Sequence, residues 1–341
     1  MKLTAAIVPA GQWGTALAVP LAKSGHSVRL YFRSEEDAAR FNASRVNARR
    51  LPGVVFPENV SATADLTEAV QDADLVVLAP ASRGLRDLCR RLRPFVPEKA
   101  IIVSVVKALF AEEPRLPSQV IAQELLGAGT GGTDAGAAAR RIAVLSGPNF
   151  AIEIARELPA GTVVASADLE TARFVQSAFM NDRLRVWTST DIVGVQLGGA
   201  LKNIIAIGAG MSDGLGMGHN ARAALITRGV AEIARLGVAL GADPMTFAGV
   251  SGIGDLILTC TGDLSRNRQA GLAIARGEPL DPRVTVEGVP TTRATYLLAR
   301  ELGIEMPITE VVYRILYEGL SPEEGLRRLM SRQPRHELDI P

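Results

Sequence analysis

Segments of strand length alternate with amphipathic helical segments through about the first 110 residues, and this alternation restricts the fold more than any other feature of the sequence. Asp74–Pro80 and Ala100–Val105 are apolar almost throughout, instead of at every second residue. Such strands, when helices separate them, are typical of a parallel sheet that is covered on both faces. Strands are predicted at Leu3–Pro9, Ser27–Phe32, Asp74–Pro80, Ala100–Val105, Arg141–Ser146 and Gly161–Ser166. We therefore expect an α/β domain with a doubly wound parallel sheet.

The remainder of the chain has a different pattern. From residue 188 onward helix follows helix, and no convincing strand is predicted. The 341 residues are also more than one hydrophobic core usually serves. We expect the α/β domain over residues 1–187 and an all-α C-terminal domain over residues 188–341, with a Gly/Ala-rich loop at Gly127–Ala139 and a polar tail at residues 331–341.

The turn after the first predicted strand carries a glycine pattern. Pro9-Ala10-Gly11-Gln12-Trp13-Gly14 resembles the dinucleotide fingerprint G-x-G-x-x-G, whose glycines let the backbone approach a pyrophosphate closely. The N-terminus of the following helix would offer N–H donors and a positive dipole end. Pro9 stands in the place of the first glycine, so the turn must differ locally, and a plain strand-to-helix turn is the alternative. The context favours a Rossmann-like domain.

The end of the second predicted strand bears on the choice of cofactor. An acid usually stands there to bind the ribose 2′-hydroxyl, whereas this chain has Arg33 and Ser34, with the acids delayed to Glu35 and Glu36. An arginine and a serine suit a 2′-phosphate, and the alternative is that Arg33 is a solvated surface charge. NADP(H) is therefore favoured over NAD(H), which the sequence also permits.

Two isolated charges in the second half of the chain suggest acid–base chemistry. Lys202 is the only charge between Asp191 and Asp213, and burial in an apolar helix would lower its pKa towards neutrality. A lysine of that kind could pass a proton to a carbonyl oxygen, unless it merely extends to solvent at a domain edge. Asp255 is similarly isolated and needs a cation, for which Lys202 is the obvious candidate, or else it caps a helix.

A short polar segment follows Asp255. Thr259 would share a helix face with Asp255, since the two are four residues apart. Ser265 begins a helix with Arg266 and Asn267 in its first turn, which assembles N–H groups, a guanidinium and an amide for a phosphate. A capped helix without a ligand is the alternative interpretation.

Composition excludes several classes of function. A net charge of +1 gives no general field that would favour nucleic acid or an anionic membrane. Cys89 and Cys260 are far apart and lack metal-like spacing, which fits a reducing cytoplasm and no metal site. Ile192–Ser212 is apolar, but Lys202 at its centre favours a buried helix over a membrane span. No nucleic-acid partner and no membrane insertion are expected.

Several segments, in the same order along the chain, resemble the NAD(P)-dependent glycerol-3-phosphate dehydrogenases. Leu197–Arg228 is similar to that family's signature almost residue for residue, and Leu145–Ala151 resembles its L-S-G-P-S-F-A loop. Gly254–Thr259 with Arg266-Asn267 resembles the family's phosphate-binding segment, and Val286-Glu287-Gly288 its cofactor-contacting V-E-G. Matches of this length are far more specific than one glycine fingerprint.

The resemblance implies NAD(P)H-dependent, reversible reduction of dihydroxyacetone phosphate to sn-glycerol 3-phosphate, which supplies glycerophospholipid synthesis. Lys202 would donate and accept the proton, with Lys107 and Asp255 beside it. The substrate would contact Lys107, Gly147, Asn149, Lys202, Asp255, Thr259, Ser265, Arg266 and Asn267. The cofactor would contact Gly11, Gln12, Trp13, Gly14, Arg33, Lys107, Ala151, Arg266 and Glu287.

Three positions depart from the family pattern: Pro9 replaces a glycine, Ala108-Leu109-Phe110 follows Lys107 where G-[IL]-E is usual, and Asn149 replaces a serine. They leave open a paralogue that reduces another small phosphorylated ketone, and a degenerate member that only senses nucleotide. Retention of Lys202 and Arg266 argues against the sensor. A homodimer through the helical domain is compatible with the sequence.

Overall fold

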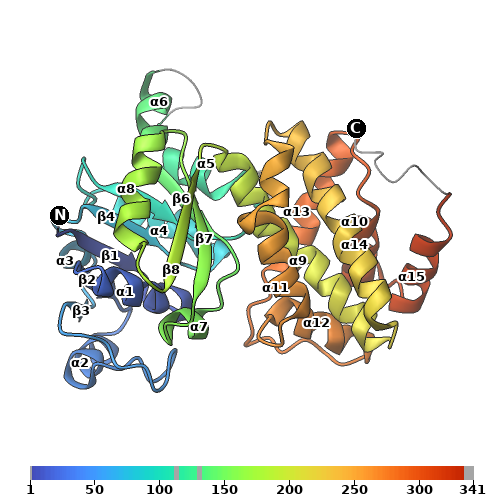
Figure 1. The fold of residues 1–341 in the computed structure, drawn as a ribbon, viewed down its shortest axis with the longest axis horizontal. Coiled ribbons are helices and arrows are strands. Elements are labelled where there is room, and N and C mark those ends of the chain that lie inside the picture. The colour runs from blue at the N-terminus through green and yellow to red at the C-terminus, as the bar shows by residue number, and fades with distance from the viewer. Residues whose placement is uncertain (1, 111–114, 129–132, 334–341) are drawn as a thin grey trace. The chain divides into compact units, whose positions relative to one another are not determined.

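A computed structural model describes residues 2–110, 115–128 and 133–333 of the chain. The chain divides into two compact units (Figure 1). The first comprises Met1–Val106 and Pro117–Ile192, and the second Lys107–Leu116 and Val193–Pro341. The segment that begins at Lys107 thus belongs to the second unit, although the first unit surrounds it in the sequence. The predicted polar tail lies outside the described residues from 334 onward.

The first unit is built on an eight-stranded sheet in the order β3-β2-β1-β4-β5-β6-β7-β8. The strands are β1 Thr4–Val8, β2 Ser27–Tyr31, β3 Val60–Thr63, β4 Leu75–Leu78, β5 Ile101–Ser104, β6 Ile142–Ser146, β7 Ala160–Ala165 and β8 Leu184–Ser189. The helices are α1 Gln12–Lys23, α2 Glu35–Ser44, α3 Leu66–Val70, the 3-10 turn η1 Ser82–Gly84, α4 Leu85–Leu92, α5 Pro117–Glu124, α6 Thr133–Arg140, α7 Ala151–Ala155 and α8 Leu169–Phe179. The strand order and the helices between the strands confirm the prediction of a Rossmann-like domain.

Burial explains why these segments form a doubly wound sheet. Every residue of β4 and β6 is buried, as expected for strands that are covered on both faces. The α1 helix buries nine consecutive residues from Gly14 to Ala22 and has Pro20 inside its last turn. The apolar residues of β1, α1 and the neighbouring strands form the hydrophobic core of this unit.

The structure corrects three expectations for this unit. The sheet is not wholly parallel, because β6 and β7 are antiparallel. Strands β3 and β8 were not predicted. Both are edge strands, and exposed residues interrupt their apolar pattern. Strand β8 also extends past residue 187, the expected end of the α/β domain. Within the expected loop at Gly127–Ala139, helix α6 begins at Thr133, since its alanines favour a helix.

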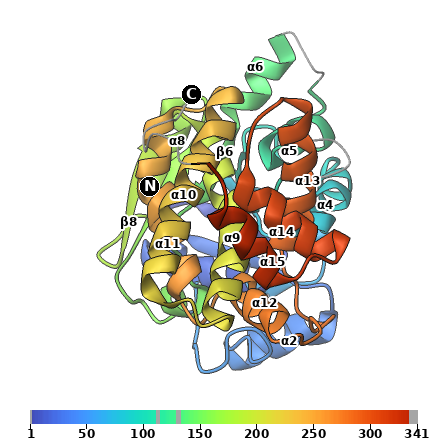
Figure 2. The same cartoon turned by 90° about the vertical axis from the view of Figure 1, so that its right-hand side faces the viewer.

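All the regular elements of the second unit, in the residues that the structure describes, are helices. Its elements are α9 Ile192–Gly214, α10 Gly218–Ala239, the 3-10 helix η2 Pro244–Ala248, the π-helical turn η3 Val250–Gly254, α11 Asp255–Thr261, α12 Arg266–Ala275, α13 Gly288–Glu301, α14 Pro307–Glu318 and α15 Pro322–Met330. The turned view shows α9 running among the other helices of this unit (Figure 2). This confirms the all-α prediction.

The α9 helix is the apolar centre of the second unit. It alone, among the described residues, is long and apolar enough to cross a membrane, but 89% of that apolar window is buried inside the structure. Its glycines permit very close helix contacts: a Cβ on Gly210 would lie 2.0 Å from the Arg268 carbonyl oxygen on α12. The composition of α9 is therefore explained by packing, as expected for a core helix.

Candidate active site

The glycine turn joins β1 to α1 in the first unit. The Ala10 amide donates to the Tyr31 carbonyl at 2.7 Å, and the Gly11 amide donates to the Pro9 carbonyl at 2.8 Å. A Cβ on Gly14 would lie 2.6 Å from the Pro9 carbonyl oxygen, so only glycine permits this close approach. The turn is therefore closed tightly even though Pro9 replaces the first glycine of the fingerprint.

The start of α1 offers unused donors for a dinucleotide. Gly11 is the N-cap residue and provides no capping side chain, and the first turn contains no acid that would compete with an anion. Beside it, the indole nitrogen Nε1 of Trp13 is buried and has no hydrogen-bond partner. A buried donor without a partner is costly unless a ligand satisfies it. The residues present therefore fit a nicotinamide dinucleotide.

The residues after β2 are divided between two roles. Ser34 caps α2, since its hydroxyl accepts from the Asp37 amide at 3.3 Å, and the acids Glu35 and Glu36 occupy the first turn of that helix. These acids serve the helix terminus, where negative charge is favourable. Arg33 is exposed directly after the strand.

The loop between β6 and α7 carries Gly147, Asn149 and Ala151. A Cβ on Gly147 would lie 2.9 Å from the Thr162 Cα, so the loop lies close against β7. The Asn149 amide nitrogen donates to the carbonyls of Pro148 and Gly161, both at 3.1 Å, whereas its oxygen Oδ1 is buried without a partner. The substitution of asparagine for serine thus leaves a fixed acceptor at this loop.

These segments lie at one edge of the sheet. Strands β1, β2 and β6 belong to the parallel part, so their carboxyl ends meet at the same edge. Ligands of open α/β sheets bind there. The cofactor-binding residues that were predicted in the first unit therefore gather on the expected side.

The second unit brings four predicted residues into one hydrogen-bonded cluster. Lys202 on α9 donates to Asp255 Oδ1 and, at 2.8 Å, to the Thr259 hydroxyl. Lys107 Nζ lies 2.7 Å from the other carboxylate oxygen of Asp255. The Thr259 hydroxyl donates to the Asp255 carbonyl at 2.6 Å, which directs its lone pairs at Lys202. Asp255 is thus held by two lysines and is not a helix cap.

Burial and charge together set the proton affinity of Lys202. Burial, which disfavours the ammonium, and the nearby charge of Lys107 lower its pKa to about 7, although Asp255 opposes the shift. The side chain of Lys202 is only 8% exposed and that of Asp255 only 1%. An amine with this pKa exchanges protons readily near neutral pH.

Local sequence explains why these residues meet. A Cβ on Gly198 of α9 would lie 2.9 Å from the Ser251 carbonyl oxygen, so only glycine lets α9 approach the turn η3 so closely. That turn leads directly into α11, whose first residue is Asp255. The glycine one turn before Lys202 therefore sets the distance between the lysine and its carboxylate.

The start of α12 forms a second polar group. Ser265 caps the helix, since its hydroxyl accepts from the Arg268 amide at 3.2 Å. Asn267 donates to Asn203 Oδ1 at 2.9 Å and accepts from the Gly288 amide at 2.9 Å, which ties α12 to α9 and to the residue after Glu287. Arg266 is exposed at this helix start.

Two residues of this region were not predicted. Asn203 follows Lys202 and orients Asn267. Asp213 accepts from Arg222 at 3.0 Å and from Arg268 at 2.8 Å, and Arg268 also reaches Asp263 at 2.9 Å. The available signal was that Asp213 is an isolated acid at the end of an otherwise apolar helix.

Comparisons with known proteins give a consistent result. The N-terminal profile of NAD-dependent glycerol-3-phosphate dehydrogenase matches residues 4–172, and the C-terminal profile matches residues 191–327. The chain is 52% identical to a glycerol-3-phosphate dehydrogenase [NAD(P)+] of Symbiobacterium thermophilum, over 98% of this chain and 95% of the relative. A corresponding enzyme of Moorella thermoacetica is 48% identical over 99% of each chain.

Solved structures agree with the sequence matches. The crystal structure of glycerol-3-phosphate dehydrogenase from Coxiella burnetii is 37% identical, with a TM-score of 0.88 over 97% of this chain and 99% of that chain. A ketopantoate reductase from Ralstonia eutropha, at 18% identity and a TM-score of 0.60, shares the fold alone. The chain therefore belongs to the NAD-dependent glycerol-3-phosphate dehydrogenase family.

Proposed function

We propose that this chain catalyses the reversible NAD(P)H-dependent reduction of dihydroxyacetone phosphate to sn-glycerol 3-phosphate. The observation that carries the proposal is the buried Lys202, whose ammonium is held by Asp255 and Thr259. Family membership supports the reaction, since relatives that span the whole chain bear the name of this dehydrogenase. We place the reaction in the cytoplasm, because both cysteines are free and buried.

Lys202 is the proton donor in the reduction. When bound, the nicotinamide cofactor supplies the hydride for the carbonyl carbon. The carbonyl oxygen gains negative charge as its double bond opens, and Lys202 transfers a proton to that oxygen to leave the alcohol. In the reverse direction the neutral amine of Lys202 takes the hydroxyl proton. Asp255 and Thr259 fix the amine in one position, so less entropy is lost when the reactive geometry forms.

The phosphate of the substrate is held at the start of α12. Arg266 supplies a guanidinium, and the helix start that Ser265 caps supplies positive dipole charge. Asn267 is fixed on both sides and keeps α12 beside Asn203. Gly147 and Asn149 in the first unit complete the proposed substrate contacts. Binding energy at the phosphate, away from the reacting carbon, orients the ketone.

The cofactor contacts are proposed at two groups of residues. In the first unit, Gly11, Gln12, Trp13 and Gly14 hold the pyrophosphate, Arg33 binds a ribose 2′-phosphate, and Ala151 adds a contact. In the second unit, Lys107, Arg266 and Glu287 complete the set. Arg33 supports a preference for NADP(H), because an exposed arginine stands where NAD-specific domains use an acid.

Purified protein tests the proposal directly. The absorbance of NADPH or NADH should fall when dihydroxyacetone phosphate is present and should stay constant without it. Lys202→Met should lower kcat by about 10² to 10⁴-fold, since a positioned proton donor contributes that much. Lys99→Met, at an exposed lysine, is the matched control and should retain wild-type turnover. Oxidation with other small phosphorylated ketones, but not with this one, would reject the substrate assignment.

A further inference from the structure

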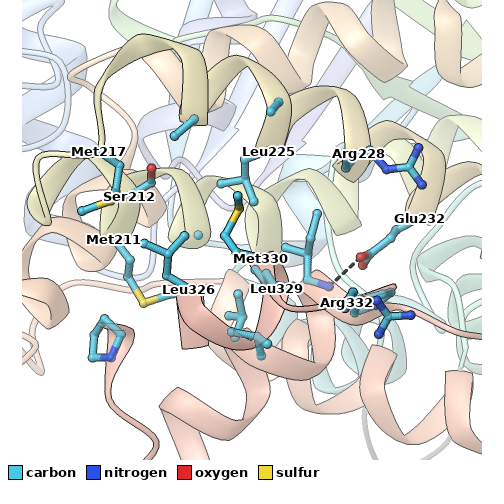
Figure 3. A pocket seen from close by; sticks show the side chains of 18 of the residues that line it. Met211, Ser212, Met217, Leu225, Arg228, Glu232, Leu326, Leu329, Met330 and Arg332 are labelled. Atoms are coloured by element: carbon cyan, nitrogen blue, oxygen red, sulfur yellow. Dashed lines mark hydrogen bonds between the residues drawn. The ribbon is translucent and has the colours of Figure 1, made fainter. Parts of the chain in front are cut away.

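Buried polar side chains in this protein are, with few exceptions, bonded to other protein groups. Glu232, for example, lines a pocket of about 500 Å³ in the second unit, yet its carboxylate accepts from the amides of Ile308 at 2.5 Å and Thr309 at 3.2 Å (Figure 3). A buried polar atom without a partner is costly, so each exception marks a place where a ligand can supply the missing bond.

In the part of the first unit that the structure describes, most of these exceptions gather at one edge of the sheet. Buried side-chain atoms without a partner occur there on Trp13, His26, Ser146 and Asn149. Trp13 comes soon after β1, Ser146 is the last residue of β6, and Asn149 follows β6, so these three lie at the carboxyl edge. His26 precedes β2 at the opposite edge. The missing partners are thus concentrated where a dinucleotide binds.

Ser146 is the clearest exception, because the other buried serines that the structure describes in this unit are bonded. Ser104 Oγ on β5 accepts from the Val106 amide at 3.3 Å, and Ser166 Oγ, directly after β7, donates to the Ile142 carbonyl at 2.7 Å. The Ser146 hydroxyl has no such partner, although the residue is only 3% exposed. It therefore keeps an unused donor at the end of β6.

The strand register places Ser146 level with the glycine turn. One row of paired residues crosses β1, β4, β5 and β6, and it consists of Val8, Leu78, Ser104 and Val144. Ser146 lies two residues beyond Val144, as Ala10 of the turn lies two residues beyond Val8. Ser146 and Ala10 therefore belong to the next row, separated by three strand spacings, or about 14 Å.

The loop after β6 gives the hydroxyl no partner because it leans towards β7. A Cβ on Gly147 would lie 2.9 Å from Thr162 Cα, and the Asn149 side chain donates to the Gly161 carbonyl at 3.1 Å. Strand β7 lies on the opposite side of β6 from β5, β4 and β1. The loop is thus directed away from the side on which the sheet continues to the glycine turn.

We propose that Ser146 donates a hydrogen bond to the carboxamide oxygen of the nicotinamide ring. The pyrophosphate lies at the β1 turn in folds of this class, so the nicotinamide half extends along the carboxyl edge towards β6. An amide oxygen accepts readily from a hydroxyl, and a fixed bond to it orients the ring. This role for Ser146 rests on the proposed function, since the bound group is the nicotinamide cofactor.

Cofactor analogues that differ at one atom test the contact in Ser146→Ala. Thio-NADPH carries sulfur in place of the carboxamide oxygen, and sulfur is the weaker acceptor. By calorimetric titration, wild type should bind NADPH about tenfold more tightly than thio-NADPH, since one buried hydrogen bond contributes about that much. In Ser146→Ala the two affinities should agree within about twofold, because NADPH loses a bond that thio-NADPH hardly makes. The NADH pair serves in the same way if the chain binds NADH more tightly.

Ser166→Ala is the matched control, because it removes a buried hydroxyl at the other end of β6. It should keep the wild-type ratio of the two affinities. A wild-type ratio in Ser146→Ala would overturn the proposal. If wild type also reduces dihydroxyacetone phosphate, that result refutes the Ser146 contact alone. A ratio that collapses only in Ser146→Ala, without turnover by wild type, would support the contact and refute the proposed reaction.

Urea unfolding without cofactor supplies a second readout. Ser146→Ala removes a buried hydroxyl that has no partner in the free protein, so the urea midpoint should rise. Ser166→Ala breaks a hydrogen bond, so its midpoint should fall. A lower midpoint for Ser146→Ala would mean that the hydroxyl already stabilises the free protein, which would also overturn the proposal.

Discussion

At the scale of single residues, the carboxylate of Asp255 carries an ammonium group on each of its oxygens. This arrangement explains how a lysine in an apolar helix keeps a useful proton affinity. Burial and Lys107 disfavour the ammonium of Lys202, while Asp255 favours it, and the balance leaves a pKa of about 7. Without Asp255 the pKa of Lys202 would be lower still, and less of the lysine would carry a proton near neutral pH.

In the proposed function, cofactor preference depends on Arg33. Arg33→Gln should lower the ratio of kcat/KM with NADPH to kcat/KM with NADH by about tenfold, because a charge-assisted contact to the 2′-phosphate is lost. The rate with NADH should hardly change. Steady-state kinetics with each cofactor measures both values, and Arg173→Gln, at an exposed arginine of α8, is the matched control. An unchanged ratio would place 2′-phosphate recognition elsewhere.

At the scale of elements, the start of α12 depends on a contact made at the end of α9. Asp213 accepts from Arg268, which is the third residue of α12 and whose amide completes the Ser265 cap. The side chains of Asp213 and Arg268 are only 12% and 11% exposed, so solvent screens this pair little. Asp213 is thus a positioning residue for Arg266 and Asn267.

Asp213→Asn should raise the KM for dihydroxyacetone phosphate by about tenfold, while kcat and the KM for NAD(P)H change much less. The reason is that the variant keeps the volume of the side chain and loses the charge that fixes α12. A merely structural role would lower the apparent kcat through the fraction of folded enzyme and leave both KM values unchanged. Asp182→Asn, at an exposed ion pair, is the control.

Glu232 links α10 to α14 and makes stability depend on pH. Burial raises its pKa to about 7, so between about pH 4.5 and pH 7 the folded chain binds more protons than the unfolded chain. Its contribution to the free energy of unfolding should therefore fall as pH rises through this window and stay constant above it.

Urea unfolding of wild type and of Glu232→Gln at pH 5, 6, 7 and 8 tests this dependence on pH. The stability of wild type relative to the variant should decline from pH 5 to pH 7 and then level off. Glu301→Gln, at an exposed glutamate of α13, should show no such trend relative to wild type. A difference that is constant across all four pH values would mean that Glu232 does not titrate in this range.

At the scale of the whole molecule, local sequence patterns predicted the buried strands, which depend on local sequence. All six predicted strands are present, because continuous apolar runs are typical of buried strands. Strands β3 and β8 escaped prediction, since an edge strand buries less and its sequence is correspondingly mixed. The antiparallel pairing of β6 with β7 depends on how the chain turns after β6, which the strand sequences do not encode.

The same distinction applies to the site. Isolation in an apolar segment was enough to select Lys202 and Asp255, because a buried charge needs a partner. The contact of Lys107 with the same carboxylate joins residues 148 apart, and no local pattern could reveal it. Its role came only from the family resemblance. Asn203 was missed for the same reason, since its partner lies on α12. Asp213 is isolated in the sequence, but its partner Arg268 lies 55 residues away and could not be identified from it.

The pH dependence of kcat/KM in both directions tests the central claim about Lys202 most directly. Because the donor must be protonated, reduction of dihydroxyacetone phosphate should fall about tenfold per pH unit above about pH 7. Oxidation of glycerol 3-phosphate should instead rise towards a plateau there, since the base must be neutral. Measurement above pH 6.5 avoids the second ionisation of the substrate phosphate, near about pH 6.

A deuterium isotope effect from labelled NADPH should accompany these profiles, to show that hydride transfer limits the rate. Opposite limbs that meet near pH 7 in wild type, and their loss in Lys202→Arg, are the predicted result. A reduction rate that stays constant from pH 6.5 to pH 9, with the isotope effect fully expressed, would contradict the assignment of Lys202 as the proton donor.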